Sequence, residues 1–207
     1  MNRNLSSTIL DYLENSDNVN HRYKSWNHCF AAFGNSNLNK TELSLNLGFY
    51  LASWGMYRGS SQLLQKNYLV HEGAVLIIQN YEKLRCSINN EINESDLDKL
   101  FLLINDLKMY YTSVSVTPTN TLISKIILGT LGCLPAFDRY FIEGVKSENF
   151  RFISLNKKSI ENLFIFLNDN HEELLDIQEK ESKNSGVFYP KMKLLDMYFY
   201  NHGYNNN

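Results

Sequence analysis

Hydrophobic residues recur at three- and four-residue intervals along most of the chain, and this spacing is typical of amphipathic α-helices. Between residues 41 and 65, for example, Leu43, Leu47, Tyr50 and Leu51 fall on one helical face. The three prolines, at positions 118, 135 and 190, each stand where such a pattern begins. The helical segments that the pattern predicts are 5–13, 23–33, 41–65 with a break near Gly55 and Gly59, 72–85, 95–111, 119–131, 135–145, 159–180 and 190–200.

Signals for β-strands are confined to two short stretches, 114–116 and 150–155, which do not supply a sheet. The 207 residues, 43% of them hydrophobic, are enough for one good core and too few for two large domains. We therefore expect an all-α fold, a single compact domain of about eight or nine helices over residues 1–200. The Asn-rich segment 201–207 is expected to be disordered.

Charge and cysteine content narrow the class of protein. A formal net charge of −2 excludes a nucleic-acid binder that relies on a strongly basic surface as a whole, but it leaves a local basic face open. The cysteines Cys29, Cys86 and Cys133 are widely spaced and odd in number, which favours reduced thiols over a disulfide framework or a zinc site. No signal peptide or apolar run of roughly 20 residues is present. A cytoplasmic protein without membrane association, cofactor or metal is predicted.

The most informative stretch is 122–141, in which an apolar helical pattern runs into Gly129 and Gly132. Pro135 is then expected to begin a second helix that carries Asp138 in its first turn. A carboxylate at that place complements the positive end of the helix dipole, which is a common structural arrangement. The same place also favours the ionised form, which a carboxylate needs if it is to stabilise positive charge in a reaction.

The order of helix, turn, helix, glycine-containing link and a small-aromatic-Asp segment resembles the core of the helix-hairpin-helix DNA glycosylase superfamily. The family has a TAxxVL-type helix followed by an xVDTH-type segment, and the matching residues here are 123–128 (ISKIIL) and 136–140 (AFDRY). The resemblance implies a helix-hairpin-helix glycosylase-like fold with Asp138 as the catalytic aspartate. Breaking an N-glycosidic bond creates an oxocarbenium-like sugar, which a nearby carboxylate stabilises.

Two departures from the family pattern modify that expectation. The family hairpin usually reads LPGVG, whereas residues 116–121 read VTPTNT, so phosphate contacts would come from Thr119 and Asn120 at the helix start. Members with lyase activity carry a lysine where this chain has Leu122, which implies a monofunctional enzyme that hydrolyses the bond without an amine nucleophile. Lys125, one turn further on, is expected to be solvated or to face a DNA phosphate.

Other parts of the chain are candidates for contacts with DNA. Residues 51–58 resemble the family's LSAQATD segment, so Trp54 and Tyr57 are candidates for stacking on a base or wedging the duplex, and Arg58 for holding a phosphate or the orphaned base. For Trp54 a place in the core is an equally good interpretation. In segment 23–28, Trp26 and His28 are further base-pocket candidates, although a lone histidine is more often structural.

Basic residues after the candidate aspartate extend the predicted DNA-binding surface, although such residues are usually just a solvated face. They are Arg139, Lys146, Arg151, Lys157 and Lys158. In the last predicted helix Asp196 is a weaker site candidate, while Tyr198 and Phe199 fit the core better.

The resemblance implies a double-stranded DNA partner that contains a damaged or modified base, with no obligate protein partner. The many aromatic residues would suit a bulky base, such as the glucosylated hydroxymethylcytosine that antiphage glycosylases excise. Two other functions stay open. Arg22 and His28 fit the R-x(4–6)-H spacing of HEPN ribonucleases, in which the pair acts on an RNA phosphate. Alternatively, the amphipathic helices form a non-catalytic interaction module.

Overall fold

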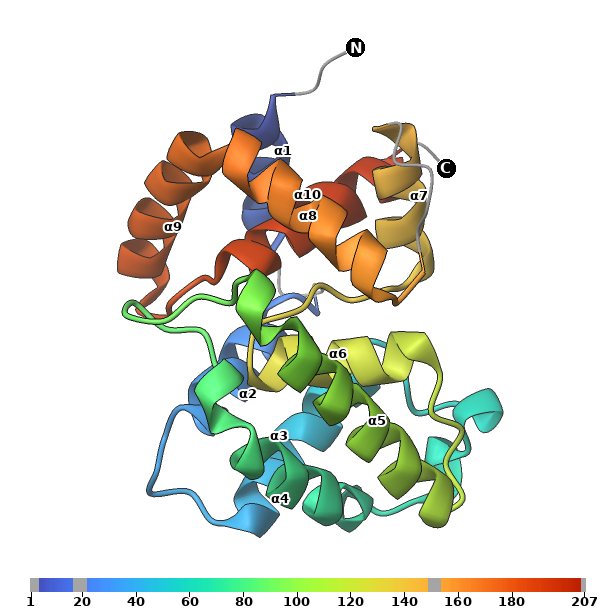
Figure 1. The fold of residues 1–207 in the computed structure, drawn as a ribbon. Helices are drawn as coiled ribbons and strands as arrows, with labels where there is room; N and C mark the ends of the chain where they lie inside the picture. The colour runs from blue at the N-terminus through green and yellow to red at the C-terminus, as the bar shows by residue number, and fades with distance from the viewer. Residues whose placement is uncertain (1–3, 17–21, 149–153, 206–207) are drawn as a thin grey trace.

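The protein is built from α-helices. The computed structural model describes residues 4–16, 22–148 and 154–205, and within these ranges it has ten α-helices, five short 3-10 turns and no strand beyond an isolated bridge between Ser87 and Asn90 (Figure 1). The all-α prediction is therefore confirmed, with ten helices in place of eight or nine. Segment 114–116 forms no strand, and much of 150–155 lies outside the described residues.

The helices follow the predicted order. Their bounds are α1 Leu5–Ser16, α2 Lys24–Phe33, α3 Lys40–Ser53, α4 Glu72–Asn80, α5 Leu97–Ser113, α6 Asn120–Thr130, α7 Arg139–Ser147, α8 Lys157–Asp169, α9 His171–Ser185 and α10 Lys191–Asn205. The 3-10 turns are Gly59–Ser61, Leu63–Gln65, Tyr68–His71, Glu82–Leu84 and Glu94–Asp96. The predicted break after α3 is confirmed, because Gly55 adopts a left-handed conformation with φ +69°.

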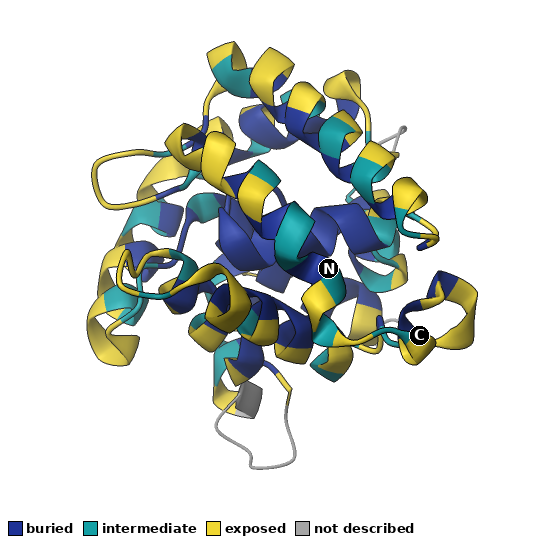
Figure 2. Cartoon of the chain, turned by 90° about the horizontal axis from the view of Figure 1, so that it is seen from below, coloured by how far each residue is buried: buried dark blue, intermediate teal, exposed yellow. Residues whose placement is uncertain are grey.

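The helices form two groups that share one main core. Helices α2 to α6 lie on one side, α1 and α7 to α10 lie on the other, and the segment after α6 crosses between them (Figure 1). The principal hydrophobic cluster includes residues from both groups, such as Trp26 and Leu47 on one side and Phe141 and Phe199 on the other. Buried residues gather on inward helix faces and along the centre of the molecule (Figure 2). No helix in the described part of the chain has the length and apolarity needed to cross a bilayer.

The last helix extends further than predicted. Helix α10 continues to Asn205, so the expectation of a disordered tail from residue 201 is wrong for residues 201–205, while residues 206–207 lie outside the description. The physical reason is close packing, because Asn201 is buried and donates its side-chain N–H to the Thr8 carbonyl at 3.0 Å. Gly203 touches α7, where a Cβ would lie 2.0 Å from the carbonyl oxygen of Tyr140.

Two further boundaries differ from the predictions because of asparagine side chains. The segment 159–180 is two helices, since Asn170 ends α8 and its side chain donates to the Phe166 carbonyl at 2.8 Å. The helix predicted to begin at residue 95 is preceded by a 3-10 turn that begins at Glu94, because Asn93 caps it in a reciprocal box with Asp96. In both cases a side-chain hydrogen bond, and not the spacing of apolar residues, sets where the helix ends or begins.

Candidate functional site

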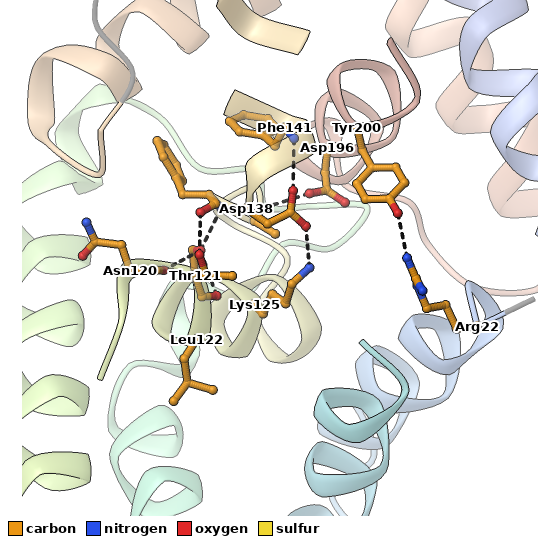
Figure 3. A network of polar contacts seen from close by, with 12 residues as sticks. Arg22, Asn120, Thr121, Leu122, Lys125, Asp138, Phe141, Asp196 and Tyr200 are labelled. Carbon is orange, nitrogen blue, oxygen red and sulfur yellow. Dashed lines mark hydrogen bonds and ion pairs between the residues drawn. The ribbon is translucent and has the colours of Figure 1, made fainter. Parts of the chain in front are cut away.

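Asp138 lies at the end of an irregular segment, residues 131–138, which we call the 131–138 link. Pro135 does not begin a helix as predicted, because α7 begins at Arg139 and Asp138 is its N-cap residue. The Asp138 Oδ1 accepts the backbone N–H of Phe141 at 3.0 Å, which satisfies one of the free amides at the helix start (Figure 3). The carboxylate is thus at a helix N-terminus, and its orientation is fixed by the backbone.

The second oxygen of Asp138 is bound by Lys125 from α6. The Nζ atom of Lys125 donates to Asp138 Oδ2 at 2.8 Å, and the Lys125 side chain is only 4% exposed (Figure 3). The expectation of a solvated lysine is therefore wrong, because α6 is surrounded by protein and its one cation needs a counter-ion, whereas the contact of Lys125 with a DNA phosphate stays a prediction. Leu122 is buried and points away from Asp138, so the amine near the carboxylate is that of Lys125.

A cavity of about 260 Å³ opens beside this pair. Four cationic side chains and one carboxylate line it, together with aromatic rings. Its walls are Arg22, Trp54, Met56, Arg58, Thr121, Lys125, Asp138, Arg139, Tyr140 and Tyr200. A concave site with aromatic walls and a few converging charged groups is the usual form of a small-molecule or nucleobase site.

The aromatic wall is held by stacked rings and cations. Trp54 stacks on Tyr23, with ring centroids 5.6 Å apart, and meets the edge of Tyr200 at 5.6 Å. Lys125 lies 4.4 Å and Arg22 lies 4.8 Å from the Trp54 ring centroid, and Arg22 also donates to the Tyr200 hydroxyl at 2.8 Å. Trp54 therefore lies in the candidate site and also packs against the core, which unites its two interpretations.

Two predicted base-pocket residues lie elsewhere. Trp26 is fully buried, stacks on Phe30 and donates its indole N–H to the Leu128 carbonyl at 2.9 Å, so it is a core residue. His28 is exposed and lines a different cavity of about 680 Å³ between α1, α2 and α9. Neither residue lines a cavity with Asp138, because the periodicity of one helix does not determine which neighbour each of its faces meets.

Tyr57, the third base-pocket candidate, belongs to a hydrogen-bonded group away from Asp138. Its hydroxyl lies 2.9 Å from Nε2 of the buried His71, whose Nδ1 lies 2.8 Å from the hydroxyl of Tyr111. Tyr57 does not line the cavity beside Asp138, so its predicted role in base contact is not supported by its position. The group ties the segment after α3 to α5 instead.

The burial of His71 makes stability depend on pH. Desolvation lowers the pKa of His71 from 6.5 to about 4, so between these pH values the unfolded chain binds more protons than the folded one. The free energy of unfolding should therefore fall as pH drops from about 6.5 to 4, by about 3 kcal/mol at 1.36 kcal/mol per pKa unit. Urea unfolding at pH 7.5 and 4.5 measures this loss. This fall in the free energy of unfolding should be smaller in His71→Gln than in the control His28→Gln. Equal falls in the two variants would contradict the role of His71.

The predicted DNA contacts divide into two groups. Arg58 and Arg139 line the cavity, and Arg139 also pairs with Glu143 at 2.9 Å. Thr119 and Asn120 are exposed but do not line it, and the Thr119 hydroxyl is used to cap α6 through the N–H of Leu122. The cavity is instead lined by Thr121, which the sequence did not single out.

The basic stretch after Asp138 is not concentrated at the site. Lys157 pairs with Asp98 at 3.0 Å on the surface, and Lys146, Lys157 and Lys158 do not line the cavity. Arg151 lies outside the described residues. Among the described residues of this stretch, only Arg139 lines the cavity beside Asp138.

The two residues of the ribonuclease alternative, Arg22 and His28, line different cavities in the structure. Arg22 lines the cavity beside Asp138, whereas His28 lines the larger cavity between α1, α2 and α9. A pair that acts on one phosphate has to converge on it. Arg22 is instead a wall residue of the Asp138 site, and the aromatic-rich segment 23–28 that follows it was the only signal of its place.

Comparison of the chain with known protein families, curated proteins and solved structures finds no match. Within the described ranges, no three histidine, cysteine or acidic side chains gather in a way that would hold a metal ion. What the site does is therefore argued from its own geometry.

Proposed function

We propose that the protein is a monofunctional DNA glycosylase, which hydrolyses the N-glycosidic bond of a base flipped into the cavity beside Asp138. The observation that carries this proposal is a fixed carboxylate in a small cavity with aromatic walls and a cationic rim. Arg58 and Arg139 are suited to the phosphates of DNA, and Trp54 is suited to stacking on an everted base.

The chemistry needs a single carboxylate. As the bond from the sugar C1′ to the base nitrogen breaks, its electron pair leaves with the base and positive charge develops on the sugar. Asp138 stabilises this charge and orients a water, whose oxygen bonds to C1′ while its proton passes to the departing base or to solvent. Each Asp138 oxygen accepts one hydrogen bond from the protein and retains a lone pair for this work.

The dimensions of the cavity bear on the size of the base. About 260 Å³ is below the roughly 300 Å³ at which pockets for drug-sized ligands begin, so this open cavity suits one nucleobase. The sugar of a glucosylated hydroxymethylcytosine would have to extend past the rim. A damaged or lightly modified base therefore fits the cavity best, and a hypermodified base fits only with its added group outside.

The ion pair of Lys125 supports hydrolysis rather than attack by an amine. Its ammonium donates to Asp138 and faces the Trp54 ring, so its nitrogen carries no lone pair while the ion pair lasts. In this arrangement Lys125 orients Asp138 and partly neutralises its negative charge.

The test is incubation of the protein with a panel of duplexes that contain normal, damaged and phage-modified bases, followed by alkali to cut abasic sites. We expect cleavage after alkali on at least one duplex and none without it. Parallel reactions with borohydride, which traps an amine joined to the sugar, should give no protein–DNA adduct. The proposal is refuted if the protein forms no abasic site on any duplex of the panel. Its monofunctional part is refuted if an adduct is trapped and Lys125→Met abolishes that adduct.

A further inference from the structure

A second lysine–aspartate pair is buried behind the 131–138 link. In α10, Lys193 Nζ donates to Asp196 Oδ2 at 2.9 Å, and the two side chains are 2% and 7% exposed. The ammonium also lies 3.3 Å from the Tyr12 hydroxyl and 5.3 Å from the centroid of the Trp26 ring. Neither charge lines the cavity beside Asp138, so this pair has no direct access to a bound base.

Stability alone does not explain two charges at this depth. Removing both ions from water offsets most of their attraction, and well-packed apolar residues often serve as well or better. Burial lowers the pKa of Lys193, and Asp196 opposes that shift. The pair therefore needs another explanation, which its remaining hydrogen bond supplies.

Asp196 holds the backbone of the link. Its Oδ1 accepts the N–H of Ala136 at 2.9 Å, in a buried contact two residues before Asp138. The link has no helical or sheet hydrogen bonding there to fix its course. Lys193 fixes the other oxygen, so the carboxylate is held at both ends.

Helix α6 holds the same segment from the opposite side. The Ser124 Oγ accepts the Phe137 N–H at 2.8 Å, and the Thr121 hydroxyl donates to the Phe137 carbonyl at 2.9 Å (Figure 3). Lys125, one residue after Ser124, holds the Asp138 side chain. Helix α10 thus holds residue 136, and helix α6 holds residues 137 and 138.

We propose that Lys193 and Asp196 are positioning residues that hold the link so that Asp138 faces the cavity at the correct distance from Lys125. This role rests on the proposed glycosylase function for its catalytic consequence. A displacement of about 1 Å in a reacting group lowers the rate by as much as about 100-fold. The ion pair is retained because it orients the acceptor for Ala136, with stability as a secondary effect.

The test compares two charge-neutral double variants, because a single substitution would leave one buried ion alone. Lys193→Met/Asp196→Leu removes the acceptor for the Ala136 N–H, whereas Lys193→Met/Asp196→Asn keeps an oxygen in the same place. Single-turnover rates on the best duplex of the panel should fall by about 10- to 100-fold in the Leu variant and recover mostly in the Asn variant. The protein concentration at half-saturation should change less than about twofold, because the cavity walls are untouched.

Amide hydrogen exchange supplies a readout that needs no substrate. The amides of Phe137 and Phe141, which Asp196 does not touch, should exchange faster in the Leu variant than in the Asn variant, while Asn201→Ala, a control in α10, leaves them unchanged. Equal exchange in the two double variants, or equal rates on DNA, overturns the proposal. If the wild type forms no abasic site at all, the proposed function fails, and faster exchange in the Leu variant still supports the positioning role.

Discussion

Asp138→Asn is expected to lower abasic-site formation by at least about 100-fold, because it removes the negative charge that we propose stabilises the sugar while keeping the shape of the side chain. Asparagine is as good an N-cap as aspartate, so α7 should still form, with the amide oxygen accepting the Phe141 N–H. The measurement is the single-turnover rate of alkali-labile site formation on the best duplex, with circular dichroism as the check on folding.

Two companion variants separate lost chemistry from lost stability. In Asp138→Asn the buried Lys125 has no counter-ion, so its free energy of unfolding should be lower than that of the wild type. Lys125→Met/Asp138→Asn removes the orphaned ammonium and should regain stability while staying inactive. Asp98→Asn, at an 88% exposed carboxylate on the surface, should keep full activity. A folded Asp138→Asn protein with a rate within twofold of wild type would exclude Asp138 as the catalytic group.

Gly144→Ala is expected to lower the free energy of unfolding by about 3 kcal/mol or more, the upper end of what overpacking does. A Cβ at this position would lie 1.9 Å from the carbonyl oxygen of Phe199 in α10. Because the neighbour is backbone, no side-chain rotation relieves the overlap, and α7 must move away from α10. Asp138 caps α7, so activity should fall together with stability.

Urea unfolding monitored by circular dichroism measures this effect. Gly59→Ala is the matched control, because a Cβ there meets nothing within 4 Å, and its midpoint should stay close to that of the wild type. If Gly144→Ala unfolds at the same urea concentration as Gly59→Ala, the close crossing of α7 and α10 does not exist as described.

Periodicity was sufficient to predict most helices, since an apolar stripe at helical spacing has to be buried against something. Periodicity did not predict which helix each apolar stripe packs against. Trp26 and Trp54 both follow polar neighbours in aromatic-rich segments, yet one binds the Leu128 carbonyl in the core and the other lines the cavity. That difference depends on how α2, α3 and α6 pack, which is information from the tertiary structure.

Asp138 was placed correctly at a helix start because its local signal is strong: carboxylates are preferred caps. The burial of Lys125 does have a signal in the sequence, because a single lysine within the apolar stretch ISKIILGT requires a buried partner. Tyr200 had no such signal and Arg22 had only the aromatic-rich segment that follows it, since both are distant from Asp138 in sequence and line its cavity only in the folded protein.

The central place of α10 has a consequence for the order in which the protein can be assembled. Residues 192–203 are buried, and they contact α1, α7 and α9, so a segment that is made after these three helices completes the interior of their half of the molecule. While the ribosome still shields α10, the helices α1 and α7 cannot bury their apolar faces against it. Native structure in this half is therefore expected only after α10 has left the ribosome, and the apolar faces of α1 and α7 stay exposed to aggregation until then.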